Sequence, residues 1–195
     1  MPAELKAAPA LLDEPHADVF KSAMRNLAGG VSIISAGRGD ARSGLTATSV
    51  TSLSLEPPSL LVCIRRASPT LAAIAAHRAF GVNVLSADQR HLAERFAGQT
   101  GISGAARFGD ADWPALATGV PLLANALAAV DCSLERLVEW SSHAIVIGRV
   151  RAIQMGSSTG PLVYWRGHYG EITLASDDEL VADLRYLELC DPDNY

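Results

Sequence analysis

The sequence predicts a mainly β protein, a β-barrel with a few peripheral helices. Runs typical of strands dominate the 195 residues, helix-like segments are few, and strand and helix do not alternate as they would in a doubly wound sheet. The sequence also lacks a G-x-G-x-x-G turn after a strand, so a Rossmann nucleotide site is not expected. Hydrophobic residues make up 49% of the chain, which is typical of a folded globular protein.

Strands are expected where β-branched and other apolar residues form runs bounded by turn signals. Six runs meet this description, at residues 31–36, 43–55, 60–64, 80–85, 126–138 and 143–153. A further hairpin is expected over residues 161–174, with its turn at Arg166 and Gly167. Residues 98–125 contain glycines and prolines without a sustained period, so they are expected to form an excursion of short turns.

Three helices are expected beside these strands. The first begins near Asp18, a residue type favoured at the N-cap, and ends at the Gly29–Gly30 pair. The second covers residues 70–77 and has Ser68 as its N-cap. The third starts with the Ser-x-x-Gln spacing of a capping box and reaches about residue 96.

The chain length supports one domain with a hydrophobic core. Residues 1–17 contain prolines and no clear periodicity, and they are expected to form a flexible arm. The domain itself is expected over residues 18–175. Residues 176–195 form an acidic tail, for which we expect a surface helix.

Charge and cysteine content limit the partners and the compartment. The formal net charge is −5 without a long run of one sign, which disfavours nucleic acid as a partner. The longest apolar stretch, residues 116–130, is interrupted by glycine, proline and asparagine, so no membrane span is expected. Three widely spaced cysteines, and a start without a signal-peptide pattern, favour reduced thiols in a cytoplasmic protein.

The most informative segment runs from Thr46 to Ser52, which contains five hydroxyl residues with only small apolar ones between them. An ordinary half-buried strand alternates apolar and polar residues, whereas this segment offers hydrogen-bonding groups on both faces. A flavin ring needs such surroundings, because its N5, O4, N3 and O2 edge is hydrogen-bonded while its faces remain apolar. A solvent-facing edge strand rich in threonine and serine is the alternative that the composition leaves open.

A second candidate is the segment from Arg65 to Thr70, which places two arginines just before a helix N-terminus. Free backbone N–H groups, the helix dipole and the Ser68 hydroxyl together favour an anion such as phosphate. The alternative is a capped helix preceded by two solvated arginines. Together the two segments indicate a flavin site more specifically than either does alone, because they lie close together in the sequence, joined by one hairpin.

With these motifs in view, the chain resembles the short-chain flavin reductases, an FMN-binding split-barrel family that supplies reduced flavin to two-component monooxygenases. The resemblance covers roughly residues 20–172 and follows the family's order. Its motifs are R-N-L-A-G-G-V-S-I-I at 25–34, G-L-T-A-T-S-V-T-S-L-S-L-E-P-P at 44–58, the strand 80–85 with residues 89–96, H-A-I-V-I-G-R-V at 143–150 and P-L-V-Y-W-R-G-H-Y at 161–169. The resemblance implies a six-stranded split β-barrel and a homodimer, because relatives complete the flavin cavity at a subunit interface.

The resemblance also implies a set of binding residues. The cofactor-binding positions are Thr46, Ala47, Thr48, Ser49, Ser52, Cys63, Ile64, Arg65, Ser68, Pro69, Thr70 and Asn83. The positions on the nicotinamide side are His143, Arg166, Gly167, His168 and Tyr169. Cys63 has no neighbouring cysteine and is expected to be a small buried hydrophobe. No side chain is expected to act as acid, base or nucleophile, and no metal site is expected.

Three functions follow as expectations. The first is an oxidoreductase that transfers hydride from NADH or NADPH to FMN or FAD and feeds a separate monooxygenase. The second is a split-barrel enzyme whose bound flavin acts on another small substrate. The third is a flavin-binding protein without enzymatic activity on the same scaffold. Hydride transfer to a flavin requires mainly that the two rings be stacked and competitors excluded, which suits a sequence without a catalytic constellation.

Overall fold

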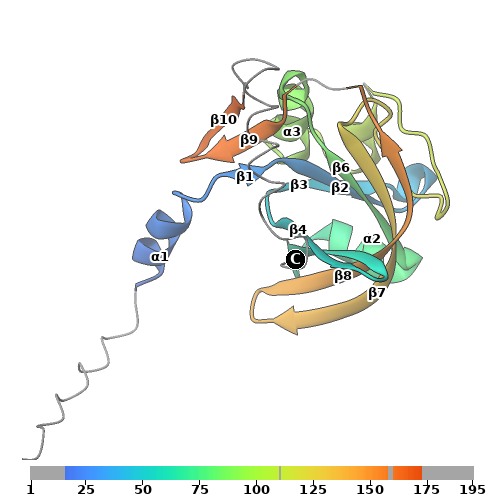
Figure 1. Cartoon of the computed structure of the whole chain (residues 1–195), viewed down its shortest axis with the longest axis horizontal. Coiled ribbons are helices and arrows are strands. Elements are labelled where there is room, and N and C mark those ends of the chain that lie inside the picture. The colour runs from blue at the N-terminus through green and yellow to red at the C-terminus, as the bar shows by residue number, and fades with distance from the viewer. Residues whose placement is uncertain (1–15, 110, 158–159, 173–195) are drawn as a thin grey trace, which may run out of the picture.

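The computed structural model describes residues 16–172, except residues 110, 158 and 159. Its strands form two sheets (Figure 1). The strands are β1 Gly29–Gly30, β2 Ser32–Ala36, β3 Ser43–Ala47, β4 Val50–Leu55, β5 Pro58–Arg65, β6 Ala79–Val84, β7 Ala128–Trp140, β8 His143–Met155, β9 Leu162–Trp165 and β10 His168–Glu171. The large sheet has the order β3-β2-β6-β7-β8-β5-β4, and the small sheet has the order β1-β9-β10. The predicted class, a mainly β split barrel with few helices, is confirmed.

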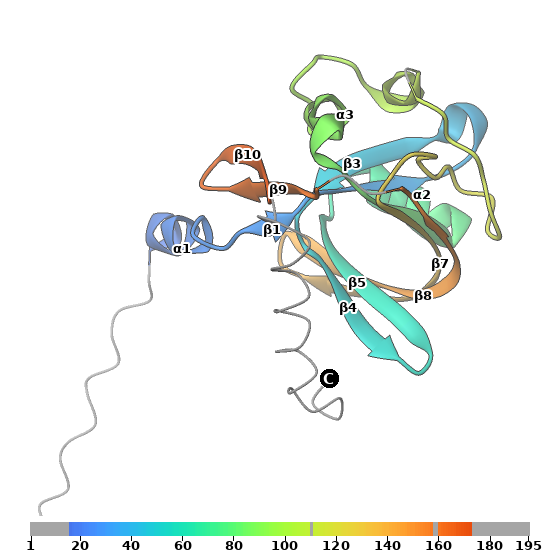
Figure 2. The same ribbon diagram turned by 45° about the horizontal axis from the view of Figure 1, so that its top comes forward.

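The large sheet contains seven strands instead of the six that were expected. All six predicted runs are present, but the run over 43–55 bends at Thr48 and Ser49 and is divided into β3 and β4. β3 pairs with β2 at one edge of the sheet, while β4 pairs with β5 at the opposite edge. β3 and β4 follow each other directly in the chain but form opposite edges of the sheet. The sheet therefore curls so that these two edges come together (Figure 2).

Helices lie around the barrel at α1 Ala17–Met24, α2 Pro69–His77 and α3 Arg90–Phe96, with 3-10 turns at η1 Gly39–Ala41, η2 Ala87–Gln89 and η3 Gly104–Phe108. Two capping predictions are confirmed. Ser68 Oγ accepts a hydrogen bond from Thr70 N at 3.2 Å, and the backbone N–H of Ser86 donates to Gln89 Oε1 at 3.1 Å in a capping box. None of the described helices is long and apolar enough to cross a bilayer.

The first helix differs from its prediction at both ends. His16 is its N-cap, and Asp18 lies in the first turn, where its carboxylate faces the positive end of the helix dipole. Gly29 and Gly30 do not end the helix, which stops at Met24; they form β1 and pair with β9. Of the expected arm at 1–17 only residues 16 and 17 are described, and Ala17 already belongs to α1. The expected acidic tail at 176–195 lies outside the described residues.

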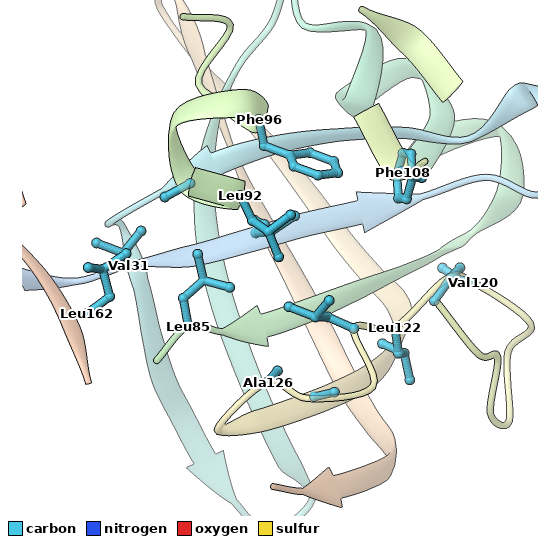
Figure 3. Close-up of a cluster of buried hydrophobic side chains, with 14 residues drawn as sticks. Val31, Leu85, Leu92, Phe96, Phe108, Val120, Leu122, Ala126 and Leu162 are labelled. Carbon is cyan, nitrogen blue, oxygen red and sulfur yellow. The ribbon is translucent and has the colours of Figure 1, made fainter. Parts of the chain in front are cut away.

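Buried side chains form two clusters on either side of the sheet. One contains Phe96 and Leu92 from α3, together with Val120 and Leu122 from the excursion after it (Figure 3). The ring of Phe96 meets that of Phe108 edge-on, with centroids 5.0 Å apart. The residues between α3 and β7 are therefore not a loose loop, because they cover one face of the sheet.

The second cluster fills the barrel and leaves no room for a side chain at Gly148. A Cβ atom at Gly148 would lie 2.4 Å from Cζ of Phe80, whose side chain is fully buried. Gly148 also lies in the centre of the sheet, opposite Leu60 on β5 and Leu134 on β7. A ring that is packed from all sides cannot move aside without cost.

We therefore expect Gly148→Ala to lower the free energy of unfolding by about 1–3 kcal/mol, the usual range for overpacking a core. Urea unfolding followed by circular dichroism measures this difference. The matched control is Gly170→Ala, because a Cβ atom there would meet only Val163 Cγ2 at 3.8 Å. Equal effects at both positions would contradict the packing argument.

Candidate flavin site

A hollow of about 500 Å³ lies beside the bend between β3 and β4. The strands β3, β5 and β8, the N-terminus of α2, the end of α3 and the turn η3 form its walls. Its lining residues, which define the ring hollow, are Leu45, Thr46, Ala47, Thr48, Ser49, Cys63, Ile64, Arg65, Ser68, Phe96, Ala97, Arg107 and His143. The structure thus brings together most of the predicted cofactor-binding residues from segments that are separate in the sequence.

Two hydroxyl groups of the ring hollow are oriented by protein carbonyls. Thr46 Oγ1 donates to the carbonyl of Ala93 at 2.6 Å, and Ser49 Oγ donates to the carbonyl of Cys63 at 3.0 Å. Since each hydroxyl proton is used, the oxygen lone pairs remain as acceptors. Acceptors fixed in this way suit a ligand edge that carries an N–H donor.

The two arginines before α2 have different environments. Arg66 pairs with Glu139 at 2.8 Å and donates to the carbonyl of Ser141 at 3.3 Å. Arg65 is exposed, lines the ring hollow, and has no ion-pair partner among the described residues. The structure therefore favours Arg65 over Arg66 as the candidate anion ligand, beside the capped start of α2.

His143 lies in the same ring hollow, directly across the β5–β8 ladder from Arg65. Its Nδ1 is 2.9 Å from the hydroxyl of Ser142. This contact engages one ring nitrogen, so Nε2 is the nitrogen left to meet a ligand.

Four predicted cofactor residues do not line the ring hollow. Asn83 is fully buried: its amide donates to the carbonyl of Ile33 at 2.9 Å, and its Oδ1 accepts from Leu123 N at 2.7 Å. Thr70 is buried with its hydroxyl 2.9 Å from that of Ser43. The exposed residues Ser52 and Pro69 lie on β4 and at the first position of α2, outside the lining. Asn83 and Thr70 therefore have structural contacts that account for them without a ligand.

The predicted nicotinamide residues are not gathered in one place. Arg166 and Gly167 line a second hollow of about 470 Å³, beside α1. Tyr169 packs edge-on against Tyr164 with centroids 5.0 Å apart, and burial, followed by the charge of Tyr164, raises the pKa of its hydroxyl. His168 is exposed and lines neither hollow. Only His143 shares the ring hollow with the flavin residues.

This second hollow, which we call the outer hollow, is lined by Phe20, Lys21, Met24, Arg25, Leu27, Thr48, Tyr164, Arg166 and Gly167. Thr48 belongs to both linings. The bend between β3 and β4 thus separates two adjoining hollows.

Comparison with known proteins identifies the family. The description "Flavin reductase like domain" matches residues 24–173. The chain belongs to the flavin reductase-like family. It is 39% identical over 153 residues to FMN reductase (NADH) RutF 2 of Methylorubrum extorquens, an alignment that covers 78% of this chain and 88% of the relative.

Two further relatives of this flavin reductase-like chain extend the comparison. The reductase component of the FADH2-dependent resorcinol hydroxylase of a Rhizobium species is 36% identical over 152 residues, covering 77% of this chain and 84% of the relative. The solved structure of the NADH:FAD oxidoreductase SgcE6 of Streptomyces globisporus, in complex with NAD and FAD fragments, superimposes with a TM-score of 0.75. That match is 28% identical and covers 86% of this chain and all of the other.

The flavin reductase-like site includes residues that the sequence motifs did not predict. Phe96 and Ala97, at the end of α3, form one side of the ring hollow. Arg107 lines it too, but its guanidinium donates to three carbonyls, those of Ile102 at 2.9 Å, Gly44 at 3.1 Å and Phe96 at 3.2 Å. Arg107 therefore stabilises the wall of the hollow. Phe96 ends the motif at 89–96 but was not assigned to the site, and no local pattern marks Ala97 or Arg107, because they reach the site only through the packing of α3 and η3.

Cys63 differs from its expectation, because it is exposed on the ring hollow and not buried. β5 alternates its side chains, with Val62 and Ile64 in the core, so Cys63 points to the other face. Cys132 is the buried thiol, and burial, followed by the charge of Asp131, raises its pKa to about 12. The described residues include no group of three or more His, Cys, Asp or Glu side chains suited to a metal ion.

The contrast between the exposed thiol of Cys63 and the buried thiol of Cys132 gives a test of the ring hollow that does not depend on activity. Iodoacetamide should alkylate Cys63 in the folded protein and leave Cys132 unmodified, since a buried thiol with a raised pKa is a poor nucleophile. With FMN at ten times its Kd, only about a tenth of the sites stay free, so alkylation of Cys63 should slow about tenfold. Peptide mass spectrometry measures both rates. An unchanged rate at Cys63 would place the flavin elsewhere.

Proposed function

We propose that this chain is an NAD(P)H:flavin oxidoreductase that transfers a hydride from a nicotinamide to FMN or FAD. The observation that carries the proposal is the ring hollow, where the hydroxyl-rich bend meets Arg65 and the N-terminus of α2. Membership of the flavin reductase-like family supports the same activity. The relative named as the reductase component of a resorcinol hydroxylase supports a separate monooxygenase as the recipient of the reduced flavin.

The lining of the ring hollow suits a flavin. Leu45 is partly exposed and Ala97 is exposed on the ring hollow, and both offer apolar surface for the faces of a planar ring. The oriented hydroxyls of Thr46 and Ser49 offer acceptors for its polar edge. Arg65, beside the capped start of α2, offers a positive charge for a phosphate group. A flavin mononucleotide has the three matching features, which are apolar ring faces, a polar ring edge and a phosphate group.

A bound flavin supplies a ring that accepts a hydride from the nicotinamide, so the protein's residues have only to bind, orient and exclude water. The bend holds the polar edge of the ring, and Ala97, at the end of α3, limits its position on one side. We place the nicotinamide near His143, whose Nε2 is free to hydrogen-bond a carboxamide or sugar because Ser142 engages Nδ1. The names of relatives that use NADH support NADH as the hydride donor.

We further propose a homodimer located in the cytoplasm. β4 is an edge strand whose residues 51–55 are all exposed, without a charged side chain to prevent pairing. Large apolar side chains are exposed on β4 and at the β7–β8 turn, with Leu55 77% and Trp140 79% exposed. Such surfaces are typical of an interface with another chain. The unpaired thiols of Cys63 and Cys132 favour a reducing compartment.

A steady-state assay with the four combinations of NADH or NADPH and FMN or FAD tests the proposed function. We expect rapid oxidation of one nicotinamide that depends on added free flavin. Tightly bound flavin without turnover of free flavin would favour a flavoprotein that acts on another substrate. No nicotinamide oxidation in any combination would favour a binding protein and overturn the proposal.

The cross-strand pair Arg65 and His143 gives two matched variants with different expected effects. Arg65→Ala should weaken FMN about ten- to a hundredfold more than riboflavin, because a charge-assisted contact contributes about 1.5–3 kcal/mol and riboflavin lacks the phosphate. His143→Ala should raise the KM for NADH several-fold, as expected for one neutral hydrogen bond of about 0.5–1.5 kcal/mol.

Flavin fluorescence titrations and initial rates separate the two effects. The flavin Kd of His143→Ala should stay within about twofold of the parent value, a change below about 0.4 kcal/mol. Equal losses of FMN and riboflavin in Arg65→Ala would make that arginine an ordinary surface group. Loss of flavin in His143→Ala would place the histidine on the flavin side of the site.

A further inference from the structure

The outer hollow combines a basic wall with an apolar one. Its lining includes three cations, Lys21, Arg25 and Arg166, and no described acidic residue. Within the described part of the chain, none of these cations forms an ion pair. Phe20 and Met24 of α1 line the hollow as well, and their side chains are 62% and 47% exposed. The hollow therefore offers both positive charge and apolar surface that remain exposed in the described fold.

Hydrogen bonds hold the basic wall in place. Asn26 follows α1, and its Oδ1 accepts from Arg166 Nε at 3.0 Å and from Arg166 Nη2 at 2.7 Å. Trp165 Nε1 donates to the carbonyl of Asn26 at 3.1 Å, and the guanidinium of Arg166 stacks 4.6 Å from the centroid of the Trp165 ring. The charge of Arg166 is thereby positioned without being neutralised, because its partners are a neutral amide and an aromatic ring.

The sequence contains a segment of the opposite charge, residues 176–195, which lies outside the described residues. Its single basic residue is Arg185. Its seven acidic residues are Asp177, Asp178, Glu179, Asp183, Glu188, Asp191 and Asp193. A segment with this charge is attracted to a surface that carries three cations and no acid.

The apolar residues of this segment match those of α1 in their spacing. Leu180, Leu184 and Leu187 recur at i, i+4 and i+7, which predicts one apolar face of a helix. Phe20 and Met24 on α1 have the same four-residue interval. Two stripes with this interval can pack against each other, as the ridges of neighbouring helices do. The segment therefore complements the outer hollow in apolar pattern as well as in charge.

The segment is also close enough to reach the hollow. Tyr169 of β10 pairs with Tyr164 of β9, which lines the hollow. Ile172 is the last described residue and follows Tyr169 by three positions, or about 10 Å along a strand. Residues 173–176 can span up to about 14 Å when extended. A helix that begins near residue 177 can therefore lie in the hollow.

We propose that residues 176–195 of this chain dock into the outer hollow as an amphipathic helix. Their leucines pack against the apolar stripe of α1, and their acidic side chains lie beside the three cations. Docking covers apolar surface that both elements otherwise expose to water. Because Thr48 lines both hollows, the docked segment also lies at the edge of the ring hollow. The chain thus closes its outer hollow with its own acidic segment.

Carbodiimide cross-linking of the full chain tests this contact, because the reagent joins a lysine to an adjacent carboxylate without a spacer. The sequence contains only two lysines, Lys6 and Lys21, so few products can form. We expect peptide mass spectrometry to find Lys21 joined to a carboxylate of residues 176–195, in a yield that falls as salt is added. Absence of this product would overturn the proposal.

Two matched variants test the apolar face of the segment. Leu184→Ser places a hydroxyl in the middle of the leucine stripe and should lower the yield of the Lys21 cross-link about threefold or more. Leu189→Ser makes the same change on the opposite side of the predicted helix, about 180° from Leu180, and should leave the yield unchanged. Equal yields from the two variants would contradict docking through the leucine stripe.

Hydrogen exchange measures the same contact from both sides. Arg25→Glu should speed amide exchange in peptides from residues 176–190 about threefold or more, and Leu184→Ser should do the same in peptides from α1. The control Arg151→Glu changes an exposed arginine of β8 that lines neither hollow, and it should alter neither rate. An effect confined to the mutated segment would mean that the two elements do not touch.

Nitrogen-15 labelling distinguishes the segment of the same chain from that of a second copy. Labelled and unlabelled protein are mixed in the unfolded state, refolded together and then cross-linked. Joined peptides that carry the same label support the proposal, whereas mixed labels in the statistical proportion would mean that a second copy fills the hollow and would overturn it. None of these measurements needs flavin or nicotinamide, so failure of the proposed function would leave them unaffected.

Discussion

The structure depends on one constraint: a single stretch of chain, residues 43–55, must pair with both edges of the same sheet. β3 hydrogen-bonds to β2 and β4 hydrogen-bonds to β5, so the chain has to turn from one edge to the other between them. The turn takes place at Thr48 and Ser49, which belong to neither strand. Small side chains before and after it leave space, and the hydroxyls of Thr46 and Ser49 are tied to neighbouring carbonyls. Barrel closure and the flavin site are therefore consequences of the same bend.

Most of the fold could be predicted because its signals are local. The six strand runs follow from the periodicity of neighbouring residues, and the caps at Ser68 and Ser86 follow from side chains that bond their own backbone. The bend within 43–55 could not be predicted, since pairing with two distant strands decides it. The role of Gly29 and Gly30 was missed for the same reason. A Cβ at Gly29 would lie 3.1 Å from Cβ of Thr48, a proximity that only the folded barrel creates.

The site was predictable where its residues come from contiguous motifs and less so elsewhere. The segments around Thr48 and Arg65 line the ring hollow as a group. Asn83 belongs to a family motif, but in the fold its amide joins β2, β6 and the loop at Leu123. The wall supplied by Arg107 carries no sequence signal, because its position results from an excursion folding over the sheet. Sequence motifs thus located the polar floor of the site better than its apolar sides.

The isolation of α1 has an energetic consequence. A helix of eight residues with no buried side chain is marginal on its own, and Asn26 is its main described connection to the hairpin of β9 and β10. When a ligand or subunit binds against this helix, ordering the helix costs conformational entropy. This cost lowers the affinity that the contacts with the helix would otherwise provide. Helix propensity at positions that never touch the ligand would then tune binding, since a chain that is already helical loses less freedom. In this protein, the free energy that stabilises this surface helix would then also contribute to the affinity of the binding site that the helix lines.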